Sequence, residues 1–82
     1  MKPIQYYGNR NIVGGRIKQA RKARGWSQGD LAAKMQVMNI NMDQKVISKI
    51  ERNQRLVTDY EVICFSRALG VSNDWLLGEC EE

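Results

Sequence analysis

The chain has 82 residues, of which 43% are hydrophobic and 27% charged, as expected for one small folded domain. It contains no histidine, which excludes Ser/His/Asp catalysis and histidine-ligated metal sites. Cys64 and Cys80 are widely spaced, which predicts reduced thiols without zinc or a disulfide. The longest apolar run, residues 62–65, is too short to span a bilayer or to form a signal-peptide core. We therefore expect a cytoplasmic protein without a cofactor.

The net charge of +4 is unevenly distributed along the chain. Through Arg55, 12 Lys and Arg are opposed by three acidic residues, which gives +9. From Leu56 onward a single arginine is opposed by six acidic residues, which gives −5. Such polarity is typical of a protein with one face that meets a polyanion. The alternative is that these cations only solvate helix surfaces.

The first predicted helix covers residues 11–24 and follows a lead-in over residues 1–10. Gly25 supplies the left-handed residue that ends it. We expect three of its apolar side chains to be buried: Ile12, Ile17 and Ala20. Two roles are possible for Arg16 and Arg21. They can contact the polyanion, or they can form an internal ion pair with Glu51 or Asp30.

The second predicted helix begins at Ser27, whose hydroxyl stands three residues before Asp30, close to a capping box. Its apolar stripe consists of Leu31, Ala32, Met35 and Met38. We expect this helix to extend to about Met38. Residues 39–41, Asn-Ile-Asn, should then bulge outward, because asparagine tolerates left-handed conformations.

Asp43 is the predicted N-cap of a third helix, and Met42 and Ile47 stand at the spacing of a hydrophobic staple. Three aliphatic residues share one arc of this helix: Val46, Ile47 and Ile50. The opposite arc carries an amide, a hydroxyl and three cations: Gln44, Lys45, Ser48, Lys49 and Arg52. This exposed arc contains no acidic residue, and Glu51 lies at its edge.

A second capping box, Thr58 to Glu61, opens a fourth helix that ends at Gly70. Its expected buried residues are Val62, Phe65 and Leu69. Ser72 caps a short fifth helix closed by Gly78, and its apolar residues are Trp75, Leu76 and Leu77. Residues 79–82 form an acidic tail. The sequence therefore predicts an all-α, compact five-helix domain over residues 11–78.

Three ordered blocks resemble the Cro/phage-repressor type (Xre family) of helix-turn-helix DNA-binding domains. They are Arg16–Ala32 with Gly25-Trp26-Ser27-Gln28, Val46–Asn53, and Ala68–Gly78, and the match covers about residues 12–78. The resemblance implies a lambda-repressor-like fold. It also implies a sequence-specific transcription regulator, most simply a repressor, and no enzyme. One departure is a turn between the second and third helices that is longer by about five residues, more than one helical turn.

In this family the second helix lies over the DNA backbone and the third enters the major groove. The implied DNA-binding residues are Gln28, Gln44, Lys45, Ser48, Lys49, Arg52 and Asn53. An amide such as that of Gln44 can pair with adenine, and a lysine can donate to guanine. Arg52 and Asn53 match positions that contact phosphates, which fix register without reading sequence. Gln28 matches a glutamine that touches the DNA backbone and supports base-reading side chains; the alternative is that Gln28 is only an exposed first-turn residue.

We expect a weak homodimer on a pseudo-palindromic operator in double-stranded DNA, because one short helix reads too few base pairs for selectivity. The expected self-contact is the fifth helix. In the alternative, Trp75 and Leu76 close the core and only Leu77 is exposed. A second possible function is an antitoxin or protein-interaction module that kept the fold, with a toxin as its partner.

Overall fold

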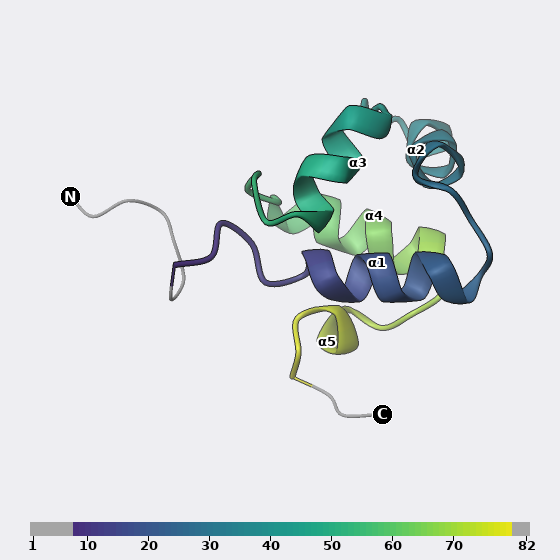
Figure 1. Ribbon diagram of the computed structural model, residues 1–82. Coiled ribbons are helices and arrows are strands. Elements are labelled where there is room, and N and C mark those ends of the chain that lie inside the picture. The colour runs from purple at the N-terminus through teal and green to yellow at the C-terminus, as the bar shows by residue number, and fades with distance from the viewer. Residues whose placement is uncertain (1–7, 80–82) are drawn as a thin grey trace.

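The computed structural model describes residues 8–79, which form five helices joined by loops (Figure 1). The helices are α1 (Gly14–Ala23), α2 (Gln28–Val37), α3 (Gln44–Glu51), α4 (Asp59–Leu69) and α5 (Asn73–Leu76). The predicted five-helix, all-α class is confirmed. Most of the predicted lead-in and acidic tail lie outside the described residues. None of the helices within residues 8–79 is long and apolar enough to cross a membrane.

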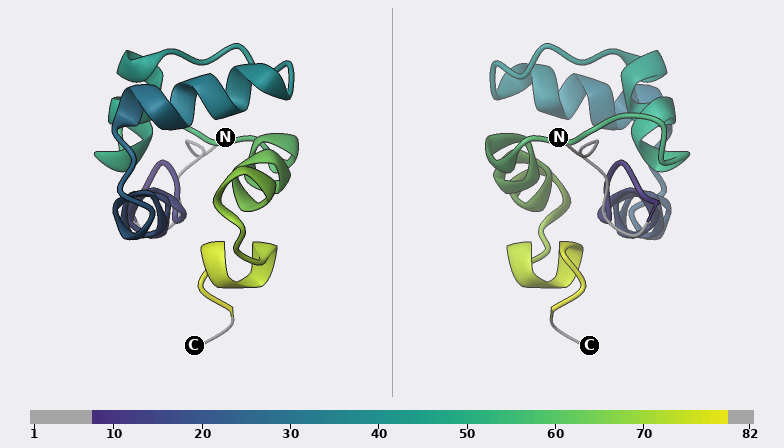
Figure 2. Two further views of the ribbon diagram at one scale, coloured as in Figure 1. Left: turned by 90° about the vertical axis from the view of Figure 1, so that its right-hand side faces the viewer. Right: turned by 90° about the vertical axis from the view of Figure 1, so that its left-hand side faces the viewer.

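Helix α1 packs against α3, α4 and α5. In addition, α2 packs against α3 and α4, and α5 packs against α4. Figures 1 and 2 show α2 and α3 at one end of the molecule and α5 at the opposite end. The helix pair that carries the polar arc is therefore remote from the last helix.

Side-chain caps determine where most of the helices begin. Ser27 and Asp30 form the predicted capping box, in which the Ser27 N–H donates to the carboxylate at 2.8 Å and the Asp30 N–H donates to the hydroxyl at 3.0 Å. The predicted caps Asp43 on α3 and Ser72 on α5 are also present, and at the start of α4 the Thr58 N–H donates to the Glu61 carboxylate at 3.0 Å. Each cap stabilises its helix by about 1 kcal/mol. The predicted glycine stops at Gly25, Gly70 and Gly78 all have positive φ.

The hydrophobic core takes side chains from all five helices. Its members are Val13, Ile17, Ala20, Leu31, Ala32, Met35, Met42, Ile47, Ile50, Phe65, Leu69 and Leu76. Three predicted members, Met38, Val46 and Val62, are only partly buried and pack against it. The prediction for Ile12 is wrong, because it is 44% exposed whereas Val13 is 2% exposed. Val13 lies one helical turn before Ile17 and shares its face, so Ile12 points away from the core.

The connection between α2 and α3 is an outward bulge, as predicted. Asn39 adopts a left-handed φ of +63° and is exposed, as is Asn41. Ile40 packs partly against the core and Met42 is buried, so the bulge is anchored by its apolar residues. The Gln36 side-chain amide donates to the Met42 carbonyl at 2.8 Å. The additional residues are thus absorbed in the turn, while α2 and α3 remain packed together.

Candidate nucleic-acid interface

The exposed face of α3 carries the polar residues that the sequence placed on one arc. Gln44, Lys45, Lys49 and Arg52 are exposed, and Ser48 is partly exposed. On the other face, Ile47 and Ile50 are fully buried. The remaining charged residue of the helix, Glu51, has a side chain only 2% exposed. The exposed arc of α3 is therefore cationic and carries no acidic group.

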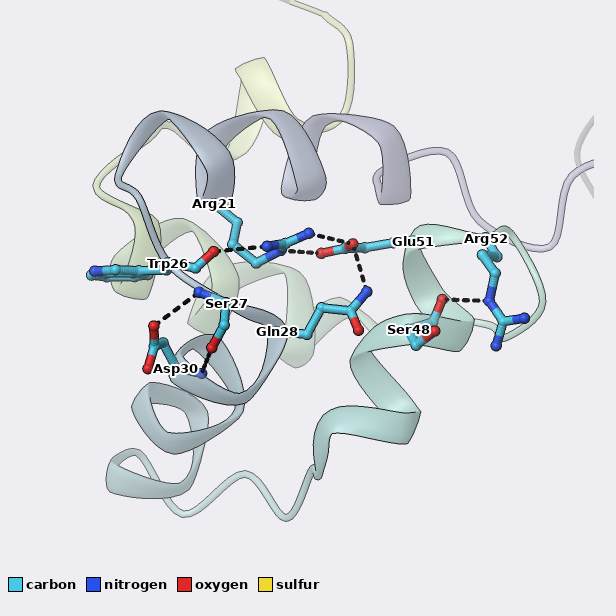
Figure 3. A network of polar contacts seen from close by, with 8 residues as sticks. All are labelled: Arg21, Trp26, Ser27, Gln28, Asp30, Ser48, Glu51 and Arg52. Carbon is cyan, nitrogen blue, oxygen red and sulfur yellow. Dashed lines mark hydrogen bonds and ion pairs between the residues drawn. The ribbon is translucent and has the colours of Figure 1, made fainter.

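Glu51 is withdrawn from the surface by an ion pair with Arg21 of α1 (Figure 3). Arg21 Nε lies 2.7 Å from one carboxylate oxygen and Nη2 lies 3.0 Å from the other, so the pair is bidentate. A third donor of the same guanidinium, Nη1, binds the Trp26 carbonyl at 2.7 Å. The hydrogen bond to Glu51 outweighs burial and raises the pKa of Arg21. Of the two roles considered for Arg21, the structure shows the internal ion pair with Glu51.

Gln28, the first residue of α2, joins the same network. Its side-chain Nε2 donates to Glu51 Oε1 at 3.0 Å, as Figure 3 shows. Neither role considered for Gln28 included this bond, and the sequence offers no local signal for it because the two residues are 23 positions apart. The contact ties the start of α2 to the last residue of α3. One carboxylate thereby fixes α1, α2 and α3 relative to one another.

Close backbone contact also holds α1 against α3. A Cβ added at Gly14 would collide with the carbonyl oxygen of Ile50. Only glycine allows this approach. The local sequence around Gly14 contains no signal for this role, because Ile50 lies far from it along the chain.

The end of α3 brings together the last two residues that the resemblance implied. Arg52 is exposed, and its Nε donates to the Ser48 carbonyl at 3.3 Å (Figure 3). Asn53 has a left-handed φ of +62°, and its side-chain oxygen accepts the N–H groups of Arg10 and Asn11. The Asn53 side chain therefore bonds to the segment ahead of α1, a role that its match to a phosphate-contacting position did not imply.

The fifth helix is fixed to α1 by Arg16. Its guanidinium lies 4.9 Å from the centre of the Trp75 ring and donates to the Trp75 carbonyl at 3.1 Å. The internal partner of Arg16 is therefore Trp75, and Arg16 does not form the ion pair with Glu51 or Asp30 that was considered for it. Leu76 is fully buried and Trp75 packs against the core, whereas Leu77 is 37% exposed. This matches the alternative in which α5 closes the core and leaves Leu77 at the surface.

The fold and this site define a class of protein. Two helices, α2 and α3, are packed through a turn, and the second presents a polar, cationic arc to solvent. Within residues 8–79, no group of three or more His, Cys, Asp or Glu side chains is arranged to hold a metal ion. The architecture is that of a lambda-repressor-like helix-turn-helix domain.

Comparison with known proteins gives the family. Residues 17–76 match the family described as helix-turn-helix, and the chain belongs to it, as an Xre-type domain. The P22 c2 repressor bound to a synthetic operator superposes with a TM-score of 0.71 at 26% identity, over 84% of this chain and 97% of that one. SinR, a master regulator for biofilm formation solved in complex with DNA, superposes with a TM-score of 0.69 at 34% identity, over 80% of this chain and 98% of that one.

A third similar structure is the hypothetical transcription factor NHTF from Neisseria, with a TM-score of 0.71 at 26% identity, over 83% of this chain and 72% of that one. No curated protein sequence matches the chain. The predicted family and fold are thus confirmed.

Proposed function

We propose that this protein is a sequence-specific DNA-binding transcription regulator that places α3 in the major groove. The observation that carries the proposal is the exposed arc of α3, which offers an amide, a hydroxyl and three cations while Glu51 is buried against Arg21. A helix fits the width of the major groove, and a cationic surface is attracted to the phosphates on either side.

The residues of this arc divide into two groups by reach and chemistry. Gln44, Lys45 and Lys49, with Ser48 at shorter reach, face outward along α3 and are assigned to base edges. Arg52, at the C-terminal end of α3, and Gln28, at the start of α2, are assigned to the DNA backbone. The bond from Gln28 to Glu51 supports this division, because it holds the start of α2 beside α3.

We further propose repression by a weak homodimer on a pseudo-palindromic operator. The likeness to the P22 c2 repressor supports repression. One short helix reads few base pairs, and a two-fold dimer with half-sites about 34 Å apart doubles the contact. Leu77 at the surface of α5 is the proposed self-contact. Because the ligand is duplex DNA, we place the protein in the cytoplasm.

Salt-dependent binding to duplex DNA tests the proposed function. If the protein neutralises six phosphates, its affinity should fall by roughly 10³ between 50 and 200 mM salt. Fluorescence anisotropy on random duplexes measures this dependence, and selection from a random library yields the operator. Absence of binding to any duplex at low salt, or binding that ignores salt, contradicts the proposal.

A protein-binding role, such as masking a toxin, is the second candidate. Tyr60 and Ile63 are exposed apolar residues one turn apart on α4, which packs against α1, α2 and α5. Such a surface suits a protein partner better than DNA. Co-expression with the product of the neighbouring gene tests it: loss of complex formation in Tyr60→Glu and Ile63→Glu, with DNA binding intact, supports this role.

A further inference from the structure

The segment Asn9–Asn11, ahead of α1, is bound to the end of α3 by one asparagine. Asn53 Oδ1 accepts the Arg10 N–H at 2.8 Å and the Asn11 N–H at 3.1 Å. Asn53 Nδ2 donates to Asn9 Oδ1 at 2.7 Å. A single side chain thus binds three consecutive residues that lie more than 40 positions away in sequence.

A second asparagine fixes the same segment from the other side. Asn11 Nδ2 donates to the carbonyls of Ile50, at 3.1 Å, and Arg55, at 2.8 Å. Its Oδ1 accepts the Gly14 N–H at 2.8 Å, at the start of α1. Because bonds to α3, to the following loop and to α1 all converge here, the backbone of Arg10 is held in one place.

Arg10 is therefore held beside the exposed arc of α3. A surface hollow is lined by Gly8, Arg10, Lys49, Asn53 and Gln54. Two of these residues are cations and none is acidic. Arg10 is exposed, and within residues 8–79 its guanidinium makes a single, long hydrogen bond, 3.4 Å from Nη1 to the Gln54 carbonyl. Most of its five donors therefore have no partner in that part of the chain and can serve a ligand.

We propose that this hollow is a subsite for a DNA phosphate, bound by Arg10 and adjacent to the base that Lys49 reads. Asn53 is a positioning residue that acts through Arg10 and contacts no DNA with its side chain. The inference rests on the proposed function. A guanidinium binds a phosphate through two parallel N–H groups, and such contacts fix the register of a recognition helix. The sequence before α1 thus becomes part of the interface.

The first test is Arg10→Ala, measured by anisotropy on one duplex at several salt concentrations. The slope of log K against log salt is negative, and loss of one phosphate contact should reduce its magnitude by about 0.9 and lower affinity at 0.1 M salt on the order of tenfold. Arg67→Ala is the matched control, because Arg67 is exposed on α4 and should leave both values unchanged. An unchanged slope in Arg10→Ala, with wild-type binding present, overturns the subsite.

The second test separates positioning from folding. Asn53→Gly removes the amide and keeps the left-handed backbone available. We expect fast hydrogen exchange at the Arg10 and Asn11 amides, unchanged exchange in α3, and a loss of affinity close to that of Arg10→Ala. Adding Arg10→Ala to this variant should then change affinity by less than twofold. Full additivity of the two substitutions overturns the role of Asn53. Absence of DNA binding by the wild type instead defeats the proposed function itself.

Discussion

Arg21 and Glu51, 30 residues apart, form a bidentate pair whose side chains are 9% and 2% exposed. Arg21→Met should lower the free energy of unfolding by about 3–5 kcal/mol, because it leaves the Glu51 carboxylate buried without its cation. Urea denaturation measures this loss. The double variant Arg21→Met/Glu51→Leu should recover most of it, since removing both charges removes the uncompensated one. A single variant as stable as the wild type would mean that the pair does not hold the helices together.

Gly14 and Gly15 are adjacent in α1 and should respond oppositely to alanine. In Gly14→Ala the new methyl group meets the Ile50 carbonyl oxygen, which should cost about 1–3 kcal/mol of stability. In Gly15→Ala no atom lies within 4 Å, so stability should rise by about 0.4–1 kcal/mol through lower entropy of the unfolded chain. Thermal unfolding of the two variants checks the prediction, which fails if both shift in the same direction.

Glu61 makes stability depend on acidity. Burial opposes ionisation of its carboxyl, but hydrogen bonds from Arg55 and the Thr58 N–H outweigh burial, so the pKa of Glu61 lies below its ordinary value of 4.5. Its contribution to stability is therefore complete above pH 4.5 and is lost as the pH falls through the folded pKa.

Glu61→Gln keeps a capping side chain but loses the ion pair with Arg55. We expect it to cost about 1.5–3 kcal/mol at pH 7 and to flatten the decline in stability as the pH falls below 4.5. Urea titrations at each pH measure both effects. Glu79→Gln, at an exposed position, is the control and should retain the wild-type acid sensitivity.

Substitutions on α3 should separate base reading from phosphate contact. Gln44→Ala and Lys49→Ala should each weaken binding to the selected operator by about 1–3 kcal/mol, and weaken binding to random duplex far less. Arg52→Ala should weaken both nearly equally, because phosphates carry no sequence. Competition binding with operator and random DNA measures the ratio of the two affinities for each variant. If selection with Gln44→Ala returns the wild-type site, Gln44 does not read a base.

Assembly should depend on Leu77. Sedimentation should show mostly monomer at low micromolar concentration. Leu77→Glu should reduce cooperative DNA binding without changing the melting temperature, because this side chain is already 37% exposed. Tyr60→Glu, an equivalent exchange on α4, should leave cooperativity intact. Monomeric binding to an asymmetric site, unaffected by Leu77→Glu, would refute the dimer.

Features that depend on nearby residues were predictable from the sequence. The caps at Ser27, Asp43 and Ser72 each join residues three positions apart, so their spacing is visible in the chain. The error at Ile12 was avoidable from spacing. Val13 is four residues before Ile17 and shares its helix face, whereas Ile12 is five residues before it and does not.

The long-range polar contacts were not predictable in the same way. Charge balance offered Glu51 or Asp30 as partners for Arg21 without choosing between them, and the choice depends on how α1 crosses α3. The contacts of Asn53 were even less predictable from the sequence. Its type and place fitted a phosphate contact, yet its amide binds residues more than 40 positions upstream. One sequence contains no signal for such a pairing.

The bulge at Asn39–Asn41 has a practical consequence for engineering. Asp43 caps α3 and Met42 is buried next to it, so these two residues fix where α3 begins. The direction in which each side chain of α3 points is therefore independent of the length of the loop after α2. Residues 44–51 can accordingly be treated as an exchangeable cassette. A transplant that keeps Ile47, Ile50 and Glu51 and replaces only the outward positions should transfer operator preference between relatives, even when their turns differ in length.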